Sequence, residues 1–142
     1  MVVALFILSF LTGSINGSLP SDTDKHPFDP CPGSPNCIIQ SLLFEETPEK
    51  LFAAAQSAMK KIDPFELDIQ NYDLRINAVF RIPIFRFKDD VQIAVEESVT
   101  GGSYLHIKSA SRVGHGDFGV NKRRVERIVS QIKTELEPNK NN

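Results

Sequence analysis

Two neighbouring stretches of alternating apolar residues, 85–95 and 103–111, constrain the fold more than any other feature of the sequence. They flank Gly101-Gly102, a pair typical of a tight turn, and therefore predict the two antiparallel strands of a hairpin. Pairing Glu97 with Ser103 brings the apolar residues of both strands onto one face of the sheet. This agreement supports the register, because a slip by one residue would turn every side chain to the opposite face.

The same register has an unusual consequence at the far end of the hairpin. It sets Asp89 opposite Ser111 and Val91 opposite Ser109, so three polar side chains point toward the core-facing side. Buried polar groups need hydrogen-bond partners. We therefore expect Asp89, Ser109 and Ser111 to bond one another or a further group.

Helical spacing is present on both sides of the hairpin. Residues 47–49 supply an N-cap threonine, a proline suited to the first helical position and a glutamate for the first turn, and Pro64 marks the end of this helix. A last helix is expected from Val120 or Asn121 to Leu136. The apolar residues of the two helices recur at helical spacing: Leu51, Phe52, Ala55, Met59 and Ile62, then Val125, Ile128, Val129, Ile132 and Leu136.

A further alternation over residues 73–80 predicts another strand, and Pro83 indicates a break or an edge position. The expected fold is α+β, an antiparallel sheet of about four strands covered on one face by two helices, in a single domain over residues 38–136. The apolar segment Ile82–Phe87 fits either a docking surface for a partner protein or lipid or buried core positions. We favour the core positions.

The ends of the chain are expected to lie outside this domain. Residues 1–20 resemble a secretory signal peptide, although an N-terminal core segment or a short membrane anchor also fits the apolar run. Residues 21–37 are expected to form a linker and a cysteine loop, and residues 137–142 a disordered tail. The predicted location is therefore extracytoplasmic: secreted, periplasmic or in a thylakoid lumen.

Charge and cysteine content narrow the function classes. A net charge of −2 argues against a nucleic-acid binder. Cys31 and Cys37 are expected to form a structural disulfide, the alternatives being a redox pair or a metal site with His26. Because three ligands make a poor zinc site, we expect neither a metal nor a cofactor.

The segment 108–124, KSASRVGHGDFGVNKRR, combines serines, glycines and charged residues between the hairpin and the last helix. A purely architectural interpretation is open: glycines turn the chain, Asp117 bonds backbone amides, Asn121 caps the helix and Arg112 pairs with Asp90. The functional interpretation is a site for a small anion or a lipid at the strand–helix junction. Its candidate residues are Ser109, Ser111, Arg112, Asp117, Asn121 and Arg124.

A third interpretation is a small hydrolase-like enzyme. Ser111, His115 and Asp117 include the three residue types of a hydrolase triad. Their closeness in sequence does not place them in triad geometry, and the sequence has no GxSxG nucleophile elbow. We therefore favour a non-enzymatic binding or accessory protein, with a hydrolase using Ser111 or His115 as the alternative.

Two motifs resemble the signatures of the DUF1499 family. The first is Cys31-Pro-x-Ser-Pro-Asn-Cys37. The second is Asp89-Asp90-Val91 followed by Ser109-x-Ser111-Arg112-x-Gly114-x-x-Asp117-x-Gly119-x-Asn121-x-x-Arg124. The resemblance covers residues 31–136 and implies a small exported or membrane-linked protein, with a membrane complex or an envelope protein as partner. It implies no catalytic residue.

Overall fold

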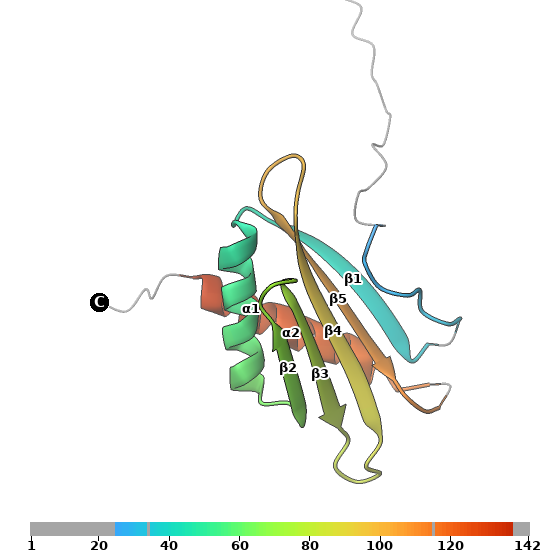
Figure 1. Ribbon diagram of the computed structural model, residues 1–142. Helices are drawn as coiled ribbons and strands as arrows, with labels where there is room; N and C mark the ends of the chain where they lie inside the picture. Colours follow the sequence, from blue (N-terminus) through green and yellow to red (C-terminus); the bar gives the residue numbers. More distant parts are fainter. Residues whose placement is uncertain (1–24, 34, 115, 138–142) are drawn as a thin grey trace, which may run out of the picture.

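The computed structural model describes residues 25–137 except residues 34 and 115, and shows an α+β fold (Figure 1). The five strands are β1 (Cys37–Phe44), β2 (Glu66–Gln70), β3 (Arg75–Arg81), β4 (Lys88–Glu97) and β5 (Ser103–Ser111). The helices are α1 (Pro48–Ile62) and α2 (Val120–Leu136). All strands form one antiparallel sheet in the order β1-β5-β4-β3-β2. The expected signal peptide (1–20) and residues 138–142 of the expected tail lie outside the described residues.

The predicted hairpin register is confirmed residue by residue. Glu97 pairs with Ser103, Asp89 with Ser111, and Val91 with Ser109. The count of about four strands is one too low, because the edge strands β1 and β2 carry weak patterns. In β1 (CIIQSLLF) apolar residues stand in adjacent pairs rather than alternating, and β2 has only five residues.

The segment before β4 differs from expectation. Phe85 and Phe87 do not extend the strand but lie in the β3–β4 loop, where Ile82 bonds Phe87 and Arg86 through the backbone. Pro83 and the left-handed φ of Arg86 account for this turn. The core position favoured for this segment is wrong, because Ile84, Phe85 and Phe87 are exposed.

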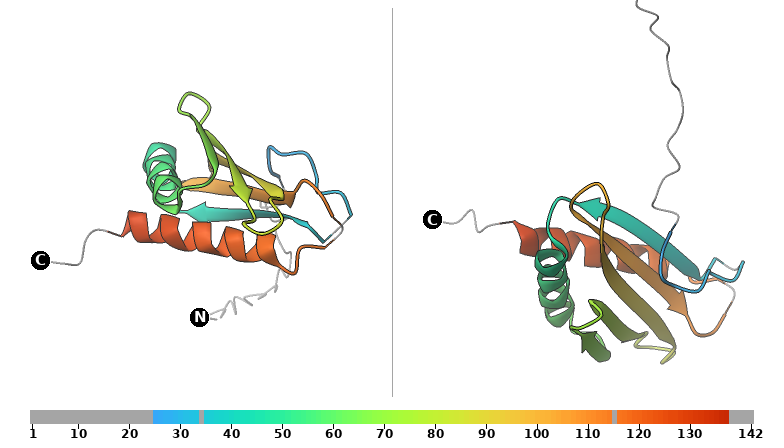
Figure 2. Two further views of the ribbon diagram at one scale, coloured as in Figure 1. Left: turned by 90° about the horizontal axis from the view of Figure 1, so that it is seen from below. Right: turned by 45° about the horizontal axis from the view of Figure 1, so that its top comes forward.

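Both helices begin and end where their sequence signals lie. Thr47 accepts a hydrogen bond from the Lys50 amide, Pro48 starts α1, and Asp63 ends it in a left-handed conformation before Pro64. α2 lies alongside β1 and β5 (Figure 2). The helices are joined near their C-terminal ends, where Glu135 accepts hydrogen bonds from Lys61 and Ser57, each at 2.7 Å.

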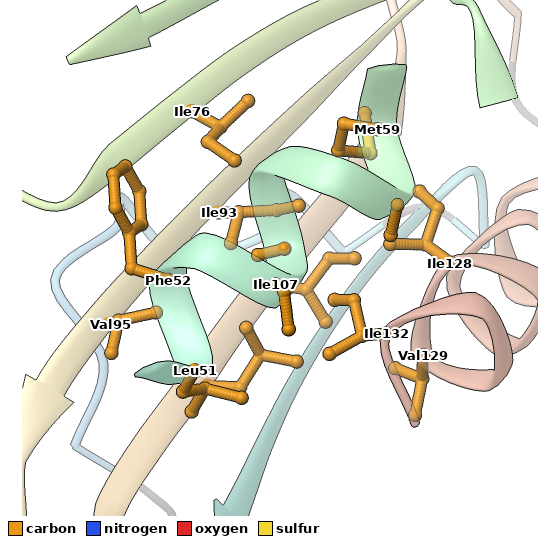
Figure 3. Packing of buried hydrophobic residues seen from close by; sticks show 14 of the residues in the cluster. Leu51, Phe52, Met59, Ile76, Ile93, Val95, Ile107, Ile128, Val129 and Ile132 are labelled. Atoms are coloured by element: carbon orange, nitrogen blue, oxygen red, sulfur yellow. The ribbon is translucent and has the colours of Figure 1, made fainter. Parts of the chain in front are cut away.

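One hydrophobic core lies between the helices and the inner face of the sheet. Its members from α1, α2 and the three central strands point toward one another (Figure 3). They include Leu51, Met59, Ile76, Ile93, Ile107, Ile128 and Ile132, all fully buried. This packing confirms that two helices cover one face of the sheet.

The outer face is not wholly solvated. His106 of β5 is 1% exposed, and its Nδ1 lies 2.8 Å from Ser41 Oγ of β1. Phe28, from the segment expected to be a linker, is also buried, and the Asp29 carbonyl accepts a hydrogen bond from Lys108. The Cys31–Cys37 disulfide is present. No helix among the described residues is long and apolar enough to cross a membrane.

Candidate functional site

Asn121 is the centre of a polar cluster at the junction of β5 and α2. Its side chain is buried, and its Oδ1 accepts hydrogen bonds from Ser109 Oγ at 2.6 Å and Arg124 Nη1 at 2.9 Å. Its Nδ2 donates to Ser111 Oγ at 2.8 Å and Asp117 Oδ2 at 2.7 Å. Asn121 therefore does not cap the helix from outside but joins strand, loop and helix from within the first turn.

Asp117 performs the capping instead. Its carboxylate accepts hydrogen bonds from the backbone amides of Gly119 at 2.8 Å and Asn121 at 3.0 Å, which are free at a helix N-terminus. Burial alone would raise the pKa of Asp117, but these bonds and the one from the Asn121 side chain lower it. The carboxylate is thereby held ionised in the turn.

Arg124 carries the one buried ion pair among the described residues. Its Nη2 donates to Asp89 Oδ2 at 2.6 Å, and the two side chains are 10% and 0% exposed. Arg124 also donates to Ser109 Oγ at 3.2 Å and lies 4.9 Å from the centre of the Phe80 ring. The predicted inward-facing group of Asp89, Ser109 and Ser111 thus meets its partners on α2, in agreement with the register.

Arg112 is the one candidate that the structure sets apart. It lies beyond the end of β5 and donates two hydrogen bonds to the exposed Asp90, at 2.8 and 2.7 Å. The hydrogen bond to Asp90 raises the pKa of Arg112. Asp90 and Asp89 are consecutive strand residues whose side chains point to opposite faces of the sheet. The structure therefore brings Ser109, Ser111, Asp117, Asn121 and Arg124 together, without Arg112.

Asn36 belongs to the cluster and was not among the predicted site residues. Its carbonyl accepts hydrogen bonds from Asn121 Nδ2 at 3.1 Å and from the Ser111 amide at 3.0 Å, and its side chain donates to the Gly114 carbonyl. Asn36 stands next to Cys37. The cysteine loop at the start of the domain is therefore bonded directly to the glycine-rich turn near its end.

An apolar pocket opens beside this cluster. It has a volume of about 440 Å³ and lies between the β3–β4 loop and the turn that precedes α2. Its apolar walls are formed by Ile82, Phe85, Phe87, Val113, Phe118 and Val120. Asp89, Ser111 and Asp117 also line it. The pocket was not predicted, because its walls come from two loops that are separated by the whole hairpin.

One atom at this pocket lacks a partner. Oδ1 of Asp89 is buried and makes no hydrogen bond within the part of the chain that the structure describes. Oδ2 of the same carboxylate holds Arg124. A buried acceptor without a partner costs roughly 1–3 kcal/mol. Because Asp89 lines the pocket and is 0% exposed, a donor reaches Oδ1 only from the pocket side and only when the pocket wall shifts to admit it.

A smaller hollow of about 270 Å³ lies on the other side of Val120. Arg123, Arg124 and Arg127 line it, and no acidic residue does. Arg123 donates one hydrogen bond to the Phe118 carbonyl. This arginine group is the part of the junction with the most positive charge, whereas the cluster around Asn121 contains two carboxylates of its own.

Among the described residues, no general base contacts the Ser111 hydroxyl. Its Oγ accepts a hydrogen bond from Asn121, and the carboxylate of Asp117 is occupied by amide donors. His115, the other residue of the hydrolase hypothesis, lies outside the described residues. No group of metal-ligating side chains is found within the described part of the chain.

Comparison with known proteins gives a family and distant structural likenesses. A family model described as "Protein of unknown function (DUF1499)" matches residues 27–132. No curated protein matches the chain in sequence.

Two solved structures illustrate the likeness. TTHA0849 from Thermus thermophilus is 10% identical with a TM-score of 0.49, over 70% of this chain and 96% of that one. Ara h 8.0201 is 12% identical with the same TM-score and the same coverage of both chains. At these values the likeness says nothing about function.

Proposed function

Since the chain belongs to the DUF1499 family, whose function is unknown, we propose a function from the site itself. The protein is a non-enzymatic binding module whose pocket at the strand–helix junction takes an apolar molecule with one hydrogen-bond-donating group. The observation that carries the proposal is the unpaired Oδ1 of Asp89, a residue that lines a mostly apolar pocket. Ligand pockets typically combine mostly apolar walls with a few polar groups that orient the ligand.

The ligand's polar group is a donor because the local acceptors are in excess. Asp89 offers a free carboxylate oxygen, whereas Arg124 already donates to Asp89, Asn121 and Ser109. A hydroxyl or an ammonium group fits this demand. A carboxylate would bring a second negative charge to Asp89 without a donor, which is unfavourable in a buried site.

The pocket can be tested with a fluorescent reporter, because the chain contains no tryptophan. We expect the emission of a Phe87→Trp variant to shift on titration with 1-decanol or decylamine. Decanoate should produce the same shift only at about tenfold higher concentration. Tighter binding of decanoate than of decanol would overturn the donor assignment and place the polar contact on the arginines.

A charge in the pocket wall supplies the specificity control. Val113→Asp should weaken decanol binding by about tenfold, because it places a solvated carboxylate where the alkyl chain lies. Val99→Asp introduces the same change at the exposed β4–β5 turn and should have no effect. Equal binding by both variants would show that the alcohol binds elsewhere.

Export is part of the proposal, and the Cys31–Cys37 disulfide supports it, because structural disulfides persist in oxidising compartments. The expected role as an accessory to a membrane complex or envelope protein also stays a proposal. The mass of the protein from its own host tests export: a mature chain that lacks residues 1–20 and carries the disulfide is expected. A full-length chain with two thiols would contradict export.

A further inference from the structure

Exposed apolar side chains gather at one end of the molecule. Among the described residues, most of the large exposed apolar side chains of this end lie in the β3–β4 loop and in the turn before α2. They are Ile84, Phe85, Phe87, Val113 and Phe118. Phe118 is 98% exposed and Ile84 is 84% exposed. We call this set the apolar tip; the β3–β4 loop is at the bottom of Figure 1.

Positive charge surrounds the apolar tip. Residues 81–88 and 112–124 contain seven lysines and arginines and one aspartate, although the whole chain has a net charge of −2. Four of these cations have carboxylate partners outside the two segments: Lys88 with Glu66, Arg112 with Asp90, Lys122 with Glu126, and Arg124 with Asp89. When the negative charges of these partners are included, this end of the molecule still has a net positive charge.

The opposite end of the molecule is acidic. Residues 44–50 and 96–103, at the β1–α1 connection and the β4–β5 turn, contain five glutamates and one lysine. The molecule is therefore a charge dipole along its strands, with the apolar tip at the positive end. An anionic surface would orient it with the apolar tip forward.

We propose that this end docks on an anionic lipid surface, with the apolar tip in the headgroup region and the arginine-lined hollow beside Val120 on the lipid phosphates. Aromatic side chains beside basic residues suit the membrane interface, and each cation near an anionic leaflet adds to binding. Arginine forms paired hydrogen bonds with phosphate. The inference goes beyond the proposed pocket, because it rests on the loops and charges and not on the occupancy of the pocket.

Two tryptophan reporters give the test. Phe118→Trp places an emitter in the apolar tip, and Tyr72→Trp places one in the β2–β3 turn at the opposite end, where Tyr72 is also 98% exposed. Both variants are made in the full chain and mixed with brominated phosphatidylcholine vesicles, with or without phosphatidylglycerol. We expect quenching only for Phe118→Trp, only with phosphatidylglycerol, and less of it at high salt.

Equal quenching of both reporters would overturn the proposal, because another part of the chain would then hold the protein on the vesicle. Absence of quenching would overturn it as well. A blue shift of the Phe118→Trp emission without vesicles that grows with protein concentration would assign the apolar tip to a second copy of the chain.

Substitutions outside the pocket walls separate docking from ligand binding. Ile84→Ser with Arg86→Glu in the Phe118→Trp background should weaken vesicle binding by about tenfold or more. The matched pair Val99→Ser with Lys50→Glu changes the opposite end and should leave it unchanged. Decanol binding should be unaffected by either pair, so failure of the pocket and failure of membrane docking give different results. Unchanged vesicle binding by the Ile84→Ser, Arg86→Glu pair would contradict the proposal.

Discussion

At the scale of single residues, buried polar side chains determine which hydrogen bonds the fold has to form. Asn121 uses both ends of its amide to hold β5, the glycine-rich turn and Arg124 together. An alanine at this position would leave several buried donors and acceptors without partners, each at a cost of roughly 1–3 kcal/mol. Asn121 can therefore be essential to the architecture while the proposed ligand contacts its neighbours.

His106 gives a prediction on pH. Burial lowers the pKa of His106 below its ordinary value, against the opposing effect of Glu96 at 3.4 Å, while His26 and Arg75 lower it further. The unfolded chain then binds more protons than the folded chain just below pH 6.5, so stability should fall as the pH falls through this range. Urea unfolding between pH 7.5 and 5.5 measures the slope. A His106→Gln variant should flatten it, whereas His26→Gln should keep most of it. An unchanged slope in His106→Gln would contradict this account.

The sequence allowed the inward-facing group to be predicted but not all of its partners. Asp89, Ser109 and Ser111 follow from the hairpin register, because strand parity is a local property. Asn36 could not be found in this way, since it reaches Asn121 across 85 positions of the chain. Its contact depends on where the cysteine loop lies against the sheet. The pairing of Arg124 with Asp89 likewise depends on the packing of α2.

At the scale of elements, helices and central strands were predictable because their signals are local. Both helices have apolar stripes, and α1 also has a threonine cap and a proline at each boundary. The edge strands were less predictable, because their strand structure depends on pairing with a neighbouring strand and not on a local alternation of apolar residues. The apolar walls of the pocket were misjudged because a run such as IPIFRF has the same composition in a core strand as in an exposed loop.

The β4–β5 turn provides an element-scale prediction. Gly101 and Gly102 both have positive φ, but a Cβ on Gly102 would lie 2.1 Å from the Phe44 carbonyl oxygen, whereas a Cβ on Gly101 meets nothing within 4 Å. We expect Gly102→Ala to lower the free energy of unfolding by roughly 3 kcal/mol, through strain and overpacking, and Gly101→Ala by about 1 kcal/mol. Thermal and urea unfolding compare the two variants. Equal losses would show that β1 moves aside without cost.

At the scale of the whole molecule, the cysteine loop and the glycine-rich turn act as one structure. The cysteine loop begins the domain, the glycine-rich turn stands near its end, and Asn36 bonds the two. The disulfide then has two effects, because it restricts the unfolded chain and also holds Asn36 against Asn121. A double-mutant cycle separates these two effects.

Removal of the disulfide by Cys31→Ser with Cys37→Ser should lower the free energy of unfolding by about 2–3 kcal/mol. In an Asn121→Ala background the loss should be smaller, by about 0.5–3 kcal/mol, since residues of one hydrogen-bond network are coupled. Met59→Ala, a buried change in α1, is the matched control and should be additive with disulfide removal. Urea unfolding of the single and combined variants measures both double-mutant cycles, one with Asn121→Ala and one with Met59→Ala. If Asn121→Ala does not fold, the milder Ser111→Ala replaces it. Additivity in both cycles would mean that the cysteine loop stabilises the domain only through the unfolded state, and that the site holds its geometry without it.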